Sequence, residues 1–135
     1  MKKILIVETN INQYLPTNQA TGIWLEEVTG FYDVVTNAGF TVDFASINGG
    51  SVPIDPNSLN ADTRTMTIYN NPKFYNQAIK NTKKISDVNS EDYIAIYFAG
   101  GHGVMWDFPD NSELQKLTEM IYQNGVIYQV YVMEK

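Results

Sequence analysis

Hydrophobic and polar positions along the chain follow two periods, which together predict four β-strands separated by helical regions. Continuous apolar runs such as Ile4-Leu5-Ile6-Val7 are typical of strands that are buried on both faces of a parallel sheet. Apolar runs or alternating apolar positions predict strands at residues 2–9, 41–46, 92–99 and 126–133.

The longest helical pattern covers residues 24–38. Apolar residues recur there at the spacing of one helix face, and a glycine stop signal follows them: Leu25, Val28, Tyr32, Val35 and Gly39. Gly30 lies inside the pattern and disfavours a helix by about 1 kcal/mol relative to alanine. The pattern therefore allows for a bend in this helix or a division of it.

A second full helix is predicted at residues 112–123, where Leu114, Leu117 and Ile121 share one face. Residues 110–112 supply its cap. Shorter helical pieces are predicted at 58–63 and 72–82.

Two polar stretches are not predicted to form strands. Residues 10–22 contain Pro16 and Gly22 and indicate a long loop, which follows a strand end. Lys83 and Lys84 are interpreted as part of a solvated helix end.

The order of the main elements is β-α-β-α-β-α-β, and this order predicts the fold class. Alternating strands and helices form a mostly parallel sheet with helices on both faces. Residues 1–135 contain no repeat, low-complexity tract or linker, so we expect a single domain.

Composition and charge narrow the possible functions. The formal net charge is −6, and no block of Lys or Arg occurs. Nucleic-acid partners and anionic membrane surfaces are therefore not expected, because both are bound through clustered cations. Cysteine is absent and there is one histidine, so no disulfide, thiolate metal site or multi-histidine metal site is expected. The N-terminal apolar run has four residues and ends at Glu8, which is short for a signal peptide, and we expect a cytoplasmic protein.

The candidate site lies where the strand at 92–99 runs into Gly100-Gly101-His102-Gly103. Ligands of open α/β sheets bind outside the carboxyl ends of the strands, and glycine amides can stabilise an oxyanion there. His102 is either a general base or a residue bonded to the backbone of its own turn. Asp107 can orient His102, cap a following turn, or have no role in the site.

Several cofactor and nucleophile motifs are missing from the sequence. The glycine cluster lacks the Gly-Lys-Ser/Thr of a phosphate-binding loop and the glycine spacing of a dinucleotide site. No serine stands in a Gly-x-Ser-x-Gly turn. We therefore expect no cofactor.

Glu26 and Glu27 lie in the first turn of the helix predicted at 24–38. Carboxylates are favoured at that position by the helix dipole, so the residues alone favour a solvated helix start. A functional role for either residue needs further support.

Five motifs in sequence order give the chain a resemblance to the DJ-1/PfpI superfamily, and to its Hsp31-like branch, which is class I glutamine-amidotransferase-like. The resemblance extends from the first strand to about Gly125. The motifs are Thr21-Gly22-Ile23-Trp24-Leu25-Glu26-Glu27, residues 38–46, Gly49-Gly50 with residues 53–58, Ala99-Gly100-Gly101-His102-Gly103 with Asp107, and Ile121-Tyr122-Gln123-Asn124-Gly125.

The resemblance implies a flavodoxin-like three-layer α/β/α sandwich that is C-terminally truncated, and a homodimer. Family members are glutathione-independent glyoxalases, which convert methylglyoxal to lactate, contested protein deglycases, and holding chaperones. By resemblance, Glu27 is the acid that assists the nucleophile and shuttles protons, and Gly100–Gly103 lines the pocket. Asp107 and Trp24 are expected beside the pocket, in support of these residues. The implied partners are a small-molecule carbonyl substrate and unfolded protein clients.

One departure from the family is as informative as the match. In the family, the strand that follows the Asn-Gly pair runs into a Cys-His pair, which should fall near Val132 and Met133, and neither residue type is present there. A glyoxalase or amidase reaction needs the thiolate, so we expect this chain to be catalytically inactive.

The tail Tyr131-Val132-Met133-Glu134-Lys135 suggests how the pair was lost. Its possible codons, read from the third base of the Tyr131 codon, can spell Cys-His-Gly. We therefore expect a frameshifted and truncated product, with a naturally diverged cysteine-less paralogue as the alternative. Three functional hypotheses follow: an inactive glyoxalase relative, a cysteine-independent holding chaperone or stress-response binding module, and a remnant without function.

Overall fold

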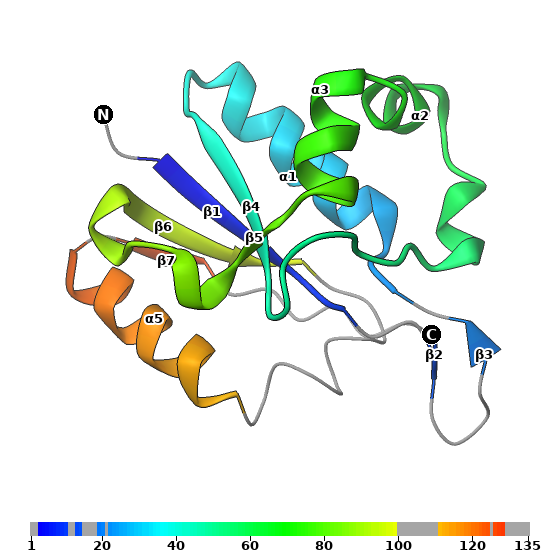
Figure 1. Cartoon of the computed structure of the whole chain (residues 1–135). Helices are drawn as coiled ribbons and strands as arrows, with labels where there is room; N and C mark the ends of the chain where they lie inside the picture. Colours follow the sequence, from blue (N-terminus) through cyan, green and yellow to red (C-terminus); the bar gives the residue numbers. More distant parts are fainter. Residues whose placement is uncertain are drawn as a thin grey trace.

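A computed structural model of the chain describes residues 3–10, 13–14, 19–20, 22–99, 111–124 and 126–128. Within them, five parallel strands form one sheet in the order β5-β4-β1-β6-β7 (Figure 1). The strands are β1 (Lys3–Glu8), β4 (Val42–Ser46), β5 (Lys83–Lys84), β6 (Tyr93–Phe98) and β7 (Val126–Tyr128). A parallel sheet with β1 at its centre agrees with the predicted fold class.

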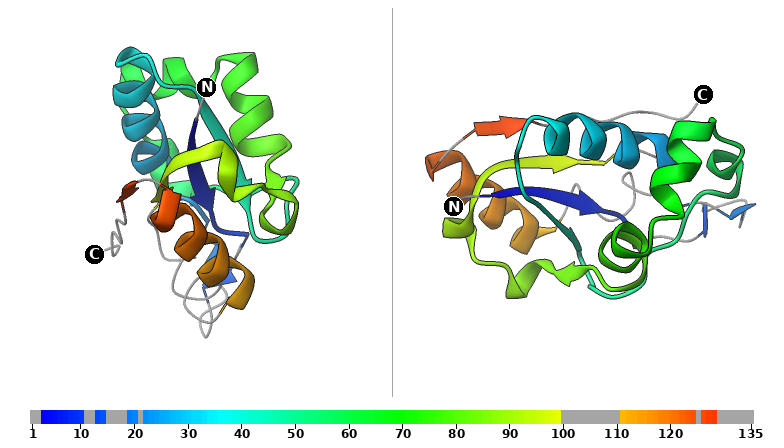
Figure 2. Two further views of the ribbon diagram at one scale, coloured as in Figure 1. Left: turned by 90° about the vertical axis from the view of Figure 1, so that its left-hand side faces the viewer. Right: turned by 90° about the horizontal axis from the view of Figure 1, so that it is seen from above.

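Helices cover both faces of this sheet. The α-helices are α1 (Leu25–Asn37), α2 (Thr63–Tyr69), α3 (Pro72–Tyr75) and α5 (Ser112–Asn124). Figure 2 shows the sheet between α5 on one face and the group formed by α1 and α3 on the other. Short 3-10 turns occupy Pro56–Leu59, Ile85–Asp87 and Ser90–Asp92, and a π-helical turn occupies Asn76–Lys80.

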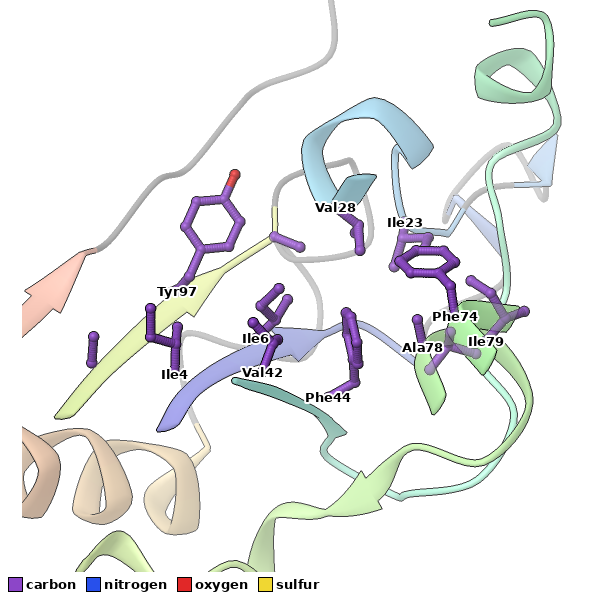
Figure 3. Close-up of a cluster of buried hydrophobic side chains, with 13 residues drawn as sticks. Ile4, Ile6, Ile23, Val28, Val42, Phe44, Phe74, Ala78, Ile79 and Tyr97 are labelled. Carbon is purple, nitrogen blue, oxygen red and sulfur yellow. The ribbon is translucent and has the colours of Figure 1, made fainter. Parts of the chain in front are cut away.

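The side chains of β1 alternate between two hydrophobic cores. Ile4 and Ile6 contribute to the core beneath α1 and α3, which Figure 3 shows in close-up. Leu5 and Val7 contribute to the core beneath α5. This alternation follows from the period of two in a β-strand, and it explains why the whole run is apolar.

Aromatic rings fill the core on the α1 side. Phe44 of β4 packs edge-on against Phe74 of α3, with ring centroids 5.6 Å apart. Tyr32 of α1 packs edge-on against Phe74 at 5.0 Å. These contacts join α1, α3 and the sheet into one packed unit.

The helical segments differ from the prediction in three ways. Gly30 does not divide α1, which continues for 13 residues. The piece predicted at 58–63 is two elements, the turn Pro56–Leu59 and helix α2, because separate residues cap them. Asp55 accepts from Asn57 N at 3.0 Å, and Asp62 accepts from Thr65 N at 2.8 Å. The piece predicted at 72–82 consists of α3 and the π-helical turn.

Two predicted irregular segments contain short strands. The predicted loop at 10–22 includes an antiparallel pair, β2 (Gln13–Tyr14) and β3 (Gln19–Ala20). Lys83 and Lys84 form the edge strand β5, so their interpretation as a helix end was wrong. Both lysine side chains are exposed, as is usual for an edge strand that must not pair further.

Candidate functional site

The carboxyl ends of β1 and β6 define the edge of the sheet where the candidate site was predicted. The two strands pair in register, with Ile6 beside Tyr97 and Val7 beside Phe98. The N–H of Ala99 continues the pairing and donates to the carbonyl of Val7 at 3.0 Å. This bond extends the pairing of β1 and β6 as far as Ala99 at the carboxyl edge.

Backbone hydrogen bonds join the segment before the start of α1 to the connection that follows β4. The N–H of Ile23 donates to the carbonyl of Pro53, and the N–H of Asp55 donates to the carbonyl of Ile23, both at 2.9 Å. Gly22 stands where a Cβ atom would lie 2.4 Å from the Pro53 oxygen. Only glycine fits that approach, which accounts for Gly22 in the motif before the helix.

Glu27 is half-buried in the first turn of α1. Its N–H donates to the carbonyl of Trp24 at 3.0 Å, and its own carbonyl accepts from the Tyr97 hydroxyl at 3.0 Å. The Tyr97 bond joins the first turn of α1 to β6, across the layer boundary. The structure therefore places the predicted acid against the strand that leads to Gly100.

Tyr97 is fixed by its surroundings as well as by its hydroxyl. Its ring stacks on Phe31 of α1, with centroids 3.8 Å apart and the rings within 5° of parallel. Figure 3 shows the ring rising from β6 on the face of the sheet where Val28 of α1 lies. Burial, and after it the negative charge of Glu27, raise the pKa of Tyr97 to about 12. The Glu27 carboxylate therefore acts on a phenol that stays neutral at physiological pH.

Trp24 occupies the N-cap position of α1 in an extended conformation. Its side chain is half-buried and makes no capping hydrogen bond. Its place beside the predicted pocket stays a prediction.

The other predicted site residues lie outside the described residues. They are Gly100, Gly101, His102, Gly103, Asp107 and the expected nucleophile position Val132. The structure thus brings together Glu27 and Tyr97 at the predicted edge, and the glycine turn stays a prediction.

Glu8 is a residue of this edge that the sequence prediction missed. It ends β1, it is fully buried, and neither of its carboxylate oxygens has a hydrogen-bond partner in the described part of the chain. Burial raises the pKa of Glu8 well above its usual range. The available signal was a carboxylate directly after an apolar run, and this pattern does not distinguish a buried carboxylate from an exposed one.

The described residues contain no cluster of three His, Cys, Asp or Glu side chains that could bind a metal ion. None of the helices in these ranges is long and apolar enough to cross a membrane.

A groove of about 340 Å³ lies on the α5 side of the sheet, and Glu27 does not line it. Its lining includes Val88, Glu113, Lys116 and Met120. The groove shares no lining residue with the carboxyl edge described above.

Comparison with known proteins gives related sequences and related folds, although no protein-family profile matches the chain. Glyoxalase 3 of Candida albicans is 29% identical over 130 residues, which are 93% of this chain and 55% of that protein. The glutathione-independent glyoxalase hsp3102 of Schizosaccharomyces pombe is 30% identical over 126 residues, 90% of this chain and 52% of that protein. The chain thus spans about half the length of these curated relatives.

Solved structures agree with the sequence comparison. The 24 kDa Rapid Encystment Protein of Francisella tularensis has a TM-score of 0.88 and 40% identity, over 96% of this chain and 58% of that one. A ThiJ/PfpI domain protein of Brachyspira murdochii has a TM-score of 0.63 and 17% identity, over 96% and 59%, and shows the fold alone. The chain is therefore a homologue of the Hsp31-like glutathione-independent glyoxalases, with the flavodoxin-like fold of the ThiJ/PfpI proteins.

Proposed function

We propose that this chain contains the acidic residue, Glu27, of a glyoxalase-like site for small carbonyl compounds and that it does not itself convert these compounds. The observation that carries the proposal is the position of Glu27, joined by its carbonyl to Tyr97 at the carboxyl edge of the sheet. The names of the curated relatives support a small carbonyl compound as the ligand class.

The predicted inactivity rests on the chemistry of the reaction. In the family that the chain resembles, a cysteine thiolate adds to the aldehyde carbon to form a hemithioacetal, and the acid then moves protons. The chain contains no cysteine. A carboxylate at Glu27 then has no thiol to activate, so the covalent step has no nucleophile.

Ligand-detected and amide-detected NMR titration with hydroxyacetone tests the location of the site. This probe keeps the ketone of methylglyoxal and has a hydroxymethyl group in place of its aldehyde. We expect concentration-dependent shifts of the amides of Glu27, Val28 and Ala99, which are weakened in Glu27→Gln. Shifts confined to the groove by Glu113 and Lys116, or no shifts at all, would contradict a carbonyl site at this edge.

A holding chaperone is the second candidate, because it needs no cysteine. Several large apolar side chains of the described residues are at least 39% exposed: Val34, Phe40, Leu59, Tyr75 and Met120. They come from five different segments of the chain. Single exposed apolar residues are normal on protein surfaces, so these positions give the chaperone hypothesis less support than Glu27 gives the carbonyl site.

A further inference from the structure

The carboxyl group of Glu8 is enclosed at the end of the central strand. Alternation along β1 places its side chain on the face of Ile4 and Ile6, beneath α1. The residue has no exposed surface, and both carboxylate oxygens are without hydrogen-bond partners in the ranges that the structure describes. Among the residues that the structure describes, no group is therefore in place to stabilise a negative charge on this carboxyl group.

The hydroxyl that lies nearest in register cannot supply that stabilisation. Ser46 pairs with Glu8 across β1 and β4, and its hydroxyl lies 2.7 Å from that of Thr82. Thr82 donates its own proton to the carbonyl of Gly50 at 2.7 Å. Ser46 must therefore donate to Thr82, while it accepts from Asn10 Nδ2 at 3.2 Å. Its single proton is committed away from Glu8.

We propose that Glu8 is an uncharged carboxylic acid in the folded chain and that its ionisation makes the carboxyl end of β1 a pH-sensitive element. Transfer of an unpaired carboxylate into a protein interior is so unfavourable that such a group keeps its proton. Burial raises the pKa of Glu8 well above its usual range, in agreement with the geometry. The proposal stands on β1 and β4 and is independent of the proposed carbonyl site.

Other titratable groups on the surrounding elements do not offset the charge. They are Lys3 on β1, Asp43 on β4, Lys83 and Lys84 on β5, Tyr93 and Tyr97 on β6, and Glu26, Glu27, Tyr32 and Asp33 on α1. Burial is the cause of the raised pKa of Glu8, with no opposing contribution from a cation. Lys83 and Lys84 are exposed at the sheet edge, and the Asp43 carboxylate accepts from Lys3 and Tyr93 at the other end of β4.

The sign of the pH effect follows from the direction of the shift. In the unfolded chain Glu8 ionises in the ordinary range of a glutamate, and in the folded chain it ionises at a higher pH. Between the two values the folded state binds more protons, so the stability falls as the pH rises. In that window the unfolding equilibrium constant increases by up to about tenfold per pH unit from this group alone.

The effect should be largest at the edge that leads to Gly100. The carbonyl of Val7, adjacent to Glu8, accepts from the N–H of Ala99 at 3.0 Å. An ionised Glu8 carboxylate needs water around it. Water can reach it when this end of β1 separates from β4 and β6. The Ala99 amide therefore reports the opening.

The experiment compares urea unfolding of the wild type, Glu8→Gln and Glu119→Gln between pH 5 and pH 8. Glu119 is an exposed residue of α5 and serves as the matched control. We expect the wild type and Glu119→Gln to lose stability with rising pH, and Glu8→Gln to lose that part of the dependence. Equal pH slopes in the wild type and Glu8→Gln would overturn the proposal.

Two further measurements on the wild type keep the proposal testable if Glu8→Gln folds poorly. In a sample with ¹³C-labelled glutamate side chains, one carboxyl resonance should still be protonated at pH 6, where exposed glutamates are ionised. Hydrogen exchange at Ala99, corrected for the intrinsic rate, should lose protection as the pH rises. Complete ionisation of every glutamate at pH 6 would show that Glu8 is charged and the proposal is wrong.

Discussion

Tyr97 determines where the acid of the candidate site lies. Its hydroxyl donates to the carbonyl of Glu27, and its ring stacks on Phe31 one turn further along α1. Both contacts are made by a single side chain of β6, so one residue positions the first turn of the helix against the sheet.

Tyr97→Phe should lower the free energy of unfolding by about 1 kcal/mol, the usual net loss for one buried hydrogen bond. The ring and its stacking on Phe31 remain in this variant. Chemical denaturation measures the loss. Tyr32→Phe is the control, because the Tyr32 hydroxyl makes no hydrogen bond within the described residues and its ring also packs in the core.

An effect of Tyr97→Phe no larger than that of Tyr32→Phe would contradict the role of the hydroxyl. It would mean that α1 is held over the sheet by its apolar face alone. The position of Glu27 would then lack the fixation described here.

At the scale of single residues, the family resemblance singles out Glu27, whose role stays a prediction, and the sequence analysis misses Glu8. Glu27 belongs to a motif that resembles a known family, whereas spacing alone favours a solvated helix start. Glu8 ends an apolar run, and a strand that ends in a carboxylate usually exposes it. Its burial results from coverage by elements distant in the sequence, which local patterns do not report.

Helix α1 is a continuous element in spite of Gly30. The position is exposed, and a Cβ atom added there would meet no atom within 4 Å. Apolar side chains on both sides of this position pack in the core: Leu25 and Val28 before it, and Tyr32 and Val35 after it. Tertiary packing thus outweighs the low helix propensity of one glycine.

Gly30→Ala should raise the free energy of unfolding by about 1 kcal/mol, because alanine favours the helix and fits without contact. Thermal denaturation followed by circular dichroism measures the change. Gly39→Ala provides the contrast. Gly39 has a φ of +97°, so alanine there should destabilise the protein even though no neighbouring atom obstructs it.

If both alanine variants were destabilised alike, the assignment of Gly30 to an unstrained helix interior would be wrong. Equal stabilisation of both would instead contradict the positive φ of Gly39. The pair therefore tests the helix and its stop signal separately.

Regular elements with strong periodicity are the ones that the sequence predicts well. Helix α5 spans Ser112–Asn124, and Leu114, Leu117 and Ile121 are buried as expected. Asn111 caps it through Leu114 N at 2.8 Å. Strands of two residues such as β5 carry no period, and their existence depends on a neighbouring strand, so a local pattern cannot predict them.

For the whole molecule, the layered architecture follows from the order of its elements. Apolar strands alternate with amphipathic helices, and right-handed crossovers then place helices on both faces of a parallel sheet. The distribution of helices between the two faces does not follow from the pattern. It is seen in the structure as α1 and α3 on one face and α5 on the other.

The central claim is that the folded chain has the acid of a thiol-dependent site and lacks the thiol. Lactate formation from methylglyoxal, followed by NMR in the presence of the purified chain, tests it most directly. Lactate is the proper readout because methylglyoxal also disappears by reaction with lysine and arginine. Glyoxalase 3 of Candida albicans serves as the active control, and Glu27→Gln and Glu26→Gln serve as the matched variants.

We predict that the wild type forms lactate no faster than buffer and that neither substitution changes this. Lactate formation by the wild type that is abolished in Glu27→Gln and retained in Glu26→Gln would contradict the claim, because another group of the chain would then replace the thiolate.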